Sequence, residues 1–199
     1  VRLAVEDAQA KGVVVAGKKV KFEIQAEDDQ ADPRTATTVA QRLADSNAKG
    51  VIGHLNSGAS IPASRIYNEA GIPQISPAST NPKLTQQNFK ATFRTIANDV
   101  QQGLGIGKYA ATVLGKKVAI IDDRTAYGQG LADEVEKAVK ANGGSLTGRE
   151  FTSDKATDFL AILTRIKAQN PDVIVYSGMD TQAGPMLKQI KQLGINAKF

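Results

Sequence analysis

The 199-residue sequence contains no cysteine, no tryptophan and a single histidine, and 5% of its residues are aromatic. Without cysteine, the chain has no thiol nucleophile, no zinc–thiolate site and no disulfide. His54 has no second histidine with which to share a metal ion, so we expect it to have a structural role. The few aromatic residues argue against a platform for base stacking. No run of 18 apolar residues occurs, so we expect no membrane-spanning segment.

The composition is that of a globular protein rather than a disordered one, with 41% apolar and 23% charged residues. The net charge is +5, but the lysines and arginines are scattered along the chain. Scattered charge favours a solvated basic surface over a nucleic-acid interface. The length suits one ordinary domain or two small ones.

Both ends of the sequence suggest a piece of a longer protein. Residues 1–11 have a weak helical pattern that Gly12 ends, without a capping residue before it. No basic segment followed by an apolar one is present, so no signal peptide is visible. The last residues, GINAKF, stop where a strand would begin. We therefore expect a fold that is incomplete at both ends.

Short apolar runs alternate with helical patterns along the chain. Asp32 and Pro33 supply a helix cap and a first-turn proline. This alternation predicts parallel sheets with helices on both faces. The expected strands are residues 19–27, 50–55, 72–76, 90–96, 116–122, 145–151 and 171–178. The expected helices are residues 1–11, 33–48, 60–71, 99–115, 127–144, 156–170 and 181–194.

The elements fall into two similar α/β sets that separate near residues 97–100. We expect an N-terminal lobe at residues 1–97, with its first strand missing, and part of a second lobe at residues 98–199. The segment RTIAND, residues 94–99, would cross between them and act as a hinge.

Small and hydroxylated residues follow two of the strands, at Asn56–Ser60 and at Pro77–Asn81. In open parallel sheets, ligands bind beyond the carboxyl ends of the strands. Ser57, with the N–H groups near Gly58, could hold a carboxylate at a helix N-terminus. Thr80 offers a hydroxyl beside an N–H. The alternative is that Ser57, Ser60 and Thr80 are ordinary helix caps.

Catalytic patterns are weak. The acidic pairs at residues 28–29 and 122–123 have no histidine or glutamate cluster beside them, so we expect no metal site. A triad of Ser57, His54 and an aspartate lacks the nucleophile elbow. Residues 103–110, GLGIGKYA, imitate a phosphate loop but follow no strand, and Tyr109 occupies the Ser/Thr position. We expect these glycines to permit close helix packing instead.

Three segments closely resemble the leucine/isoleucine/valine-binding proteins of bacterial ABC importers. They are residues 50–85, 122–135 and 173–194, and the resemblance extends in order over essentially the whole chain. It implies a type I periplasmic-binding (Venus-flytrap) α/β fold with two Rossmann-like, parallel-sheet lobes that close by hinge motion. It also implies a monomeric receptor without catalysis, cofactor or metal. Such a receptor is periplasmic or lipid-anchored and delivers its amino acid to a membrane permease.

The same resemblance implies roles for individual residues. Ser57 and Thr80 would hold the ligand α-carboxylate, while the Ala78 carbonyl and the Thr80 hydroxyl would take the α-ammonium. Tyr127 would cover the ligand from the second lobe. A zwitterion needs donors at one end and acceptors at the other, because a buried charge must be paired.

The sequence departs from the family at Met179, where relatives often place a tyrosine that faces the ligand side chain. Met179 could reshape that pocket or simply pack in the core. The acidic partner that the family uses for the ammonium lies outside this chain. The expected ligand-binding residues are Ser57, Gly58, Ala78, Ser79, Thr80, Tyr127 and Met179.

Alternative functions remain open from the sequence. The same fold could bind another small ligand, such as an aromatic acid, an amide or urea. A nucleotide-dependent α/β enzyme is a second alternative, although the glycine fingerprint and an acid–base cluster are missing. A sugar-type transcription regulator would need an N-terminal pair of DNA-binding helices, which the sequence does not contain.

Overall fold

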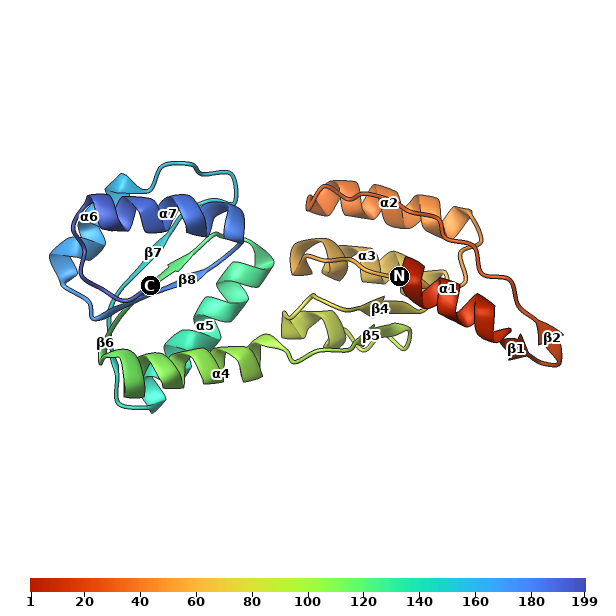
Figure 1. The fold of residues 1–199 in the computed structure, drawn as a ribbon, viewed down its shortest axis with the longest axis horizontal. Helices are drawn as coiled ribbons and strands as arrows, with labels where there is room; N and C mark the ends of the chain where they lie inside the picture. Colours follow the sequence, from red (N-terminus) through yellow and green to blue (C-terminus); the bar gives the residue numbers. More distant parts are fainter.

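The computed structural model describes all 199 residues, which form two bodies side by side (Figure 1). Each body is built around a three-stranded parallel sheet. We call residues 1–97 lobe one and residues 98–199 lobe two. The first sheet has the order β3-β4-β5 and the second the order β7-β6-β8. The strands are β3 (Val51–Ile52), β4 (Gln74–Ser76), β5 (Thr92–Arg94), β6 (Lys117–Asp122), β7 (Ser145–Phe151) and β8 (Val173–Ser177).

Seven α-helices connect or flank these strands. Their ends follow local signals: Asp32 caps α2 by accepting from the N–H of Thr35, and Asn98 forms a capping box with Gln101. No helix has both the length and the apolar composition required to cross a membrane. The helices are α1 (Arg2–Lys11), α2 (Pro33–Asp45), α3 (Ser57–Glu69), α4 (Asp99–Tyr109), α5 (Ala126–Ala141), α6 (Leu160–Gln169) and α7 (Asp180–Gln192). A 3₁₀ turn, η1 (Pro82–Thr85), follows β4, and a π-helical turn, η2 (Ala110–Leu114), extends α4.

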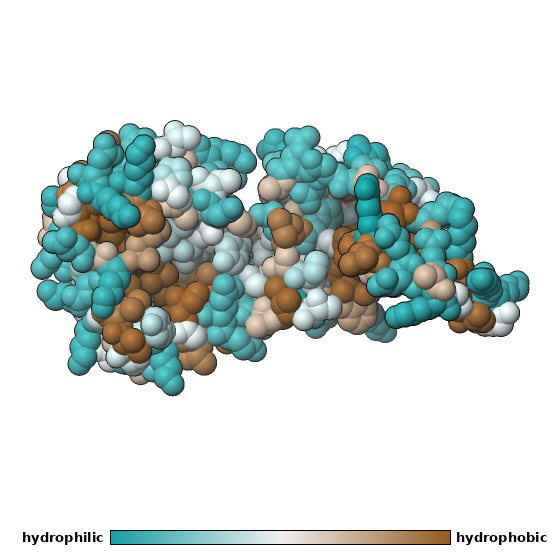
Figure 2. Space-filling model, viewed as in Figure 1, coloured by the Kyte–Doolittle hydropathy of each residue, from teal (hydrophilic) through white to brown (hydrophobic).

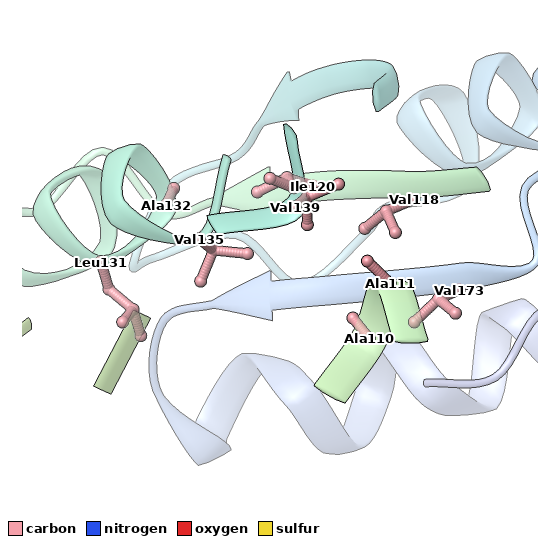
Figure 3. Close-up of a cluster of buried hydrophobic side chains, with 9 residues drawn as sticks. All are labelled: Ala110, Ala111, Val118, Ile120, Leu131, Ala132, Val135, Val139 and Val173. Carbon is pink, nitrogen blue, oxygen red and sulfur yellow. The ribbon is translucent and has the colours of Figure 1, made fainter. Parts of the chain in front are cut away.

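Lobe two has a core on each face of its sheet, because the side chains of β6 alternate between the two faces. Val118 and Ile120 join the cluster under η2 and α5 that Figure 3 shows in close-up. Ala119 and Ile121 join a second cluster, beneath α6 and α7. All four residues have no exposed surface. The predicted arrangement of helices on both faces is therefore confirmed for this sheet.

Lobe one has helices on one face of its sheet. A cluster that includes Val39 of α2, Val51 of β3 and Tyr67 of α3 forms that core. On the other face, the ladder aligns Ile52 with Ile75 and Ile75 with Phe93. Ile52 and Phe93 are about half exposed, so the expectation of helices on both faces is wrong for this sheet. Figure 2 shows hydrophobic residues among hydrophilic ones on the surface of both lobes.

The expected strand at residues 19–27 is wrong beyond Lys19. Only β1 (Val14–Val15) and β2 (Lys18–Lys19) pair there, as a short antiparallel ladder. The N–H of Val20 still donates across the hairpin to the Val13 carbonyl at 2.9 Å, and the residues that follow it run without ladder hydrogen bonds as far as Asp29. An alternating apolar pattern makes a strand only where a second segment supplies the hydrogen-bond partners, and no segment of the structure pairs with these residues.

Helices α4 and α5 pack closely through two glycines of the former. A Cβ at Gly103 would lie 2.5 Å from the Cβ of Glu134, and one at Gly107 would lie 2.6 Å from the Cβ of Ala138. Both distances are shorter than any real contact allows. The packing role expected for the glycines of residues 103–110 is therefore confirmed at these two positions.

Candidate ligand-binding site

Ser57 begins α3 at the carboxyl end of β3 and is 1% exposed. Its Oγ accepts a hydrogen bond from the backbone N–H of Asn81, at 3.1 Å. It therefore does not cap its own helix. Ser60, one turn later, donates to the carbonyl oxygen of His54 at 3.1 Å. Neither serine is the ordinary cap that the sequence left as an alternative.

Thr80 lies at the second hydroxyl-bearing strand end, after β4. Its hydroxyl is buried and forms no hydrogen bond that meets ordinary geometric limits. The Thr80 carbonyl accepts from the N–H of Asp99 at 2.9 Å, which ties this strand end to the start of α4. The cap of η1 is Asn81, not Thr80. The alternative of a capping role for Thr80 is therefore also wrong.

Asp99 is a fully buried carboxylate close to Thr80. Neither of its side-chain oxygens forms a hydrogen bond that meets ordinary geometric limits. Burial raises the pKa of Asp99, while the nearby Thr80 hydroxyl and the Arg94 guanidinium act in the opposite direction. Nothing in the sequence distinguishes Asp99 as a site residue, since an acidic residue in the first turn of a helix is a common feature that favours the helix dipole.

Ser79 directs its hydroxyl into the protein. Its Oγ lies 2.5 Å from the Oγ of Ser60, and its single hydrogen is within reach of the carbonyl oxygens of His54, at 3.1 Å, and Leu55, at 3.0 Å. These bonds fasten the end of β4 to the end of β3. The side chain of Ser79 is therefore occupied by protein partners, whereas neighbouring Ala78 is only half-buried.

His54 has the structural role expected from the sequence. Its Nδ1 lies 2.5 Å from an Asp29 carboxylate oxygen, and its Nε2 lies 3.1 Å from the Tyr67 hydroxyl. Both ring nitrogens thus have partners, and the residue is 7% exposed. Burial raises the pKa of the Tyr67 hydroxyl, and the negative charge of Asp29 adds to this effect.

In lobe two, Tyr127 lies in the first turn of α5. Thr125 caps this helix by accepting from the N–H of Gly128 at 3.0 Å. Tyr127 is half-buried and packs against the cluster drawn in Figure 3. Burial raises the pKa of Tyr127, and the charges of Asp99 and Asp123 contribute in the same direction. Because the carbonyl of the adjacent Ala126 accepts from Asn81 of lobe one, Tyr127 lies close to the contact between the lobes.

The acidic pair that ends β6 supports this helix start. Asp123 is 1% exposed and accepts from the N–H of Thr125 at 2.9 Å and from its hydroxyl at 2.6 Å. Asp122 forms an ion pair with Arg149 at 3.3 Å. Both carboxylates thus hold the local structure around the α5 N-terminus.

Met179 follows β8 and precedes α7, and it is half-buried. Its carbonyl oxygen accepts from the N–H groups of Gln182 and Ala183, at 3.2 and 3.1 Å. A Cβ at neighbouring Gly178 would lie 2.9 Å from a carboxylate oxygen of Asp123. The ends of β6 and β8 therefore meet at one edge of the second sheet.

The two lobes touch where the strand ends of lobe one meet α5. The side-chain amide of Asn81 donates to the carbonyl oxygen of Ala126 at 2.6 Å. A Cβ at Gly58 would lie 4.0 Å from the Cβ of Ala126. These contacts bring the segments that carry Ser57, Thr80 and Tyr127 to one junction. The hydrogen bonds of Met179 stay within lobe two.

A hollow of about 620 Å³ lies at the opposite, amino-terminal edge of the second sheet. Its two lysines are already used: Lys167 donates to the Leu193 carbonyl at 2.6 Å, and Lys198 to the Leu114 carbonyl at 2.7 Å. This hollow offers no free cation and is remote from the hydroxyl-bearing strand ends.

The family model of the periplasmic binding proteins matches residues 1–199. The chain belongs to the periplasmic binding protein family. Its fold is accordingly the type I periplasmic-binding fold that the resemblance implied, with a Rossmann-like parallel sheet in each lobe.

Individual relatives of this periplasmic binding protein agree. It is 41% identical over 186 residues to Leu/Ile/Val-binding protein homolog 1 of Brucella abortus, covering 93% of this chain and 50% of the relative. It is 40% identical over 198 residues to an amino acid binding protein of Pseudomonas aeruginosa, covering 98% and 52%. A substrate-binding protein from Desulfitobacterium hafniense, solved in complex with Leu, matches with 32% identity and a TM-score of 0.78, covering 98% and 58%. The chain thus spans about half the length of the curated relatives it matches.

Proposed function

We propose that this protein is a solute-binding receptor that captures a branched-chain or similar apolar amino acid between its lobes and performs no catalysis. The lobes are residues 1–97 and 98–199, and residues 94–99 form the hinge. The observation that carries the proposal is the junction itself, where two hydroxyl-bearing strand ends meet the N-terminus of α5. The names of the relatives, which bind leucine, isoleucine and valine, supply the ligand class.

Lobe one supplies the polar contacts in this proposal. The Ser57 hydroxyl and the N–H of Gly58, in the first turn of α3, bind the α-carboxylate, which the helix N-terminus favours. Thr80 adds a donor to the carboxylate and an acceptor to the α-ammonium. The Ala78 carbonyl completes the ammonium site. Ser79 contributes through its backbone, because its hydroxyl is occupied.

Lobe two covers the ligand in this proposal. Tyr127 presents an aromatic ring from the first turn of α5, and Met179 lines the region of the ligand side chain. A thioether adapts to apolar groups of different shape. If Met179 widens that region, an aromatic acid, an amide or urea becomes the alternative ligand on the same fold.

The location of the receptor and its delivery of the ligand are inferred from the family. We infer that the receptor works outside the cytoplasmic membrane, in the periplasm or lipid-anchored at the cell surface. It acts as a monomer and hands its ligand to the permease of an ABC importer. The family description supports the periplasmic location, and the solved relative described as an ABC-transporter substrate-binding protein supports the importer.

A ligand panel tests the proposal on the full-length natural protein. Thermal shifts are measured with leucine, isoleucine, valine, phenylalanine, an aromatic acid, urea and NAD. Ligand at 100 times its dissociation constant stabilises by about 2.7 kcal/mol. We expect shifts with the aliphatic amino acids. A response restricted to the aromatic acid or urea would favour the alternative ligand, and one restricted to NAD would overturn the receptor function.

The site is tested by calorimetry on Thr80→Ala. Removing a hydrogen bond to a charged group costs about 1.5–3 kcal/mol, so leucine affinity should fall about 10-fold to about 150-fold. The matched control is Thr112→Ala, whose exposed hydroxyl donates only to the Lys108 carbonyl of its own helix. Equal affinities of the two variants would remove Thr80 from the site.

A further inference from the structure

Asn81 is only 8% exposed, and each of its polar groups forms a hydrogen bond within the protein. Its backbone N–H donates to the Oγ of Ser57 at 3.1 Å, and its Oδ1 accepts from the N–H of Lys83 at 2.9 Å. Its Nδ2 donates to the Ala126 carbonyl at 2.6 Å, and its own carbonyl accepts from Arg94 at 3.3 Å. Ala126 belongs to the other lobe, so one residue joins a site of lobe one to a helix of lobe two.

The backbone bond of Asn81 sets the direction of the Ser57 hydroxyl. Because the Ser57 oxygen accepts from Asn81, its own hydrogen is left to donate to another group. A donor that is already oriented loses less rotational freedom on binding an anion than a free rotor does. Asn81 thereby makes Ser57 a donor suited to a carboxylate.

The side chain of Asn81 reaches the first turn of α5, the turn that contains Tyr127. This approach needs a glycine at position 130. A Cβ at Gly130 would lie 2.6 Å from the Nδ2 of Asn81 and 3.3 Å from an oxygen of Asp99. Gly130 has no positive φ, so backbone conformation does not require the glycine. The glycine is required at position 130 because the Asn81 side-chain amide occupies the space that a Cβ would fill.

We propose that Asn81 is a positioning residue that couples carboxylate capture to lobe closure. Its backbone orients Ser57, and its amide fastens the same strand end to the helix start that carries Tyr127. The hydrogen bond to Ala126 holds the lobes together around the bound ligand and slows ligand release. This role rests on the proposed receptor function and adds a residue that does not touch the ligand itself.

Asn81→Ser tests the coupling in the full-length protein. Serine keeps the backbone N–H for Ser57 and a hydroxyl that can cap η1, but it is too short to reach Ala126. Asn81→Asp is the second variant. Aspartate keeps the size of the side chain and the cap of η1, but it places a carboxylate oxygen, which cannot donate, against the Ala126 carbonyl. By stopped flow, leucine should dissociate about 3- to 10-fold faster from both, the equivalent of one lost hydrogen bond. An unchanged dissociation rate in both variants would overturn the coupling.

A lobe-distance measurement separates this role from a purely local one. Residues 1–199 contain no cysteine, so Gln41→Cys on α2 and Lys188→Cys on α7 supply two labels for energy transfer, with any cysteine elsewhere in the full-length protein replaced by serine. Asn81→Ser should increase the mean distance between the lobes without ligand. This measurement needs no ligand, so it tests the hydrogen bond between Asn81 and Ala126 even if the wild-type protein binds no amino acid. An unchanged distance would overturn the proposal that the Asn81 amide holds the two lobes together.

Gly130→Ala provides an independent test. Its methyl group would displace the Asn81 amide, so it should increase both the dissociation rate and the lobe distance. The double variant with Asn81→Ser should be no more affected than the more severe single variant, because both remove one contact. Fully additive effects would show that the two residues act separately and would overturn the coupling.

Discussion

Ser57→Ala should weaken amino-acid binding more than it weakens the fold. The residue is 1% exposed, so its hydroxyl would meet the ligand carboxylate with little competition from water. A hydrogen bond to a charged group contributes about 1.5–3 kcal/mol, which corresponds to an affinity loss of about 10-fold to about 150-fold. Alanine also leaves the Asn81 N–H without its partner, which should lower the free energy of unfolding by about 1–3 kcal/mol. Calorimetric titration with leucine measures the first effect, and urea unfolding measures the second.

Ser64→Ala is the matched control on the same helix. The Ser64 hydroxyl is also buried, but it donates to the Ile61 carbonyl at 2.6 Å and accepts from Gln87 at 2.9 Å. This variant should lose about 1 kcal/mol of stability and keep wild-type affinity. If Ser57→Ala binds leucine within about threefold of Ser64→Ala, which is less than about 0.7 kcal/mol, the carboxylate role of Ser57 is refuted.

Three further predictions concern stability, each measured by urea unfolding. Gly103→Ala should lower the free energy of unfolding by about 1–3 kcal/mol, because its methyl group would meet Glu134. Gly105→Ala, which has open space around it, should instead raise that free energy by about 0.5–1 kcal/mol. Similar effects of the two substitutions would contradict the helix-packing role of Gly103. Leu163→Ala, at a fully buried core position, should cost about 2–5 kcal/mol, and a loss below about 1 kcal/mol would be inconsistent with its packing. Burial raises the pKa of Asp99 above 3.8, so this carboxyl favours folding at low pH and loses that contribution as pH rises through its folded-state pKa. The stability of Asp99→Asn relative to wild type should therefore be greater at pH 7 than at pH 4, and a pH-independent difference would exclude this effect.

Elements specified by local patterns were predicted well. The strand at residues 145–151 has the same bounds in the structure, and the cap of α2 is Asp32 as expected. The start of α3 was missed by three residues, because it begins at Ser57 rather than Ser60. That difference matters for the site, since it puts Ser57 in the first helical turn, where N–H groups are free to bind an anion.

Hydroxyl groups were harder to assign than helices and strands. A capping serine and a ligand-binding serine have the same sequence signature, and only the partner atom distinguishes them. For Ser57 that partner is the N–H of Asn81, 24 positions away, and for Ser79 it is the carbonyl of His54, 25 positions away. Periodicity contains no information about such distant pairs.

The sequence by itself determined the α/β alternation and the placement of small and hydroxylated residues after the strands. These depend on short-range properties, namely side-chain spacing, caps and small residues. Only the tertiary structure decided that residues 21–27 lack a sheet partner and that the side chain of Asp99 is buried without a hydrogen bond. It also revealed that Asn81 reaches Ala126, 45 positions along the chain. Pairing, burial and contacts between lobes depend on how distant segments pack, and packing is settled only when the whole chain has folded.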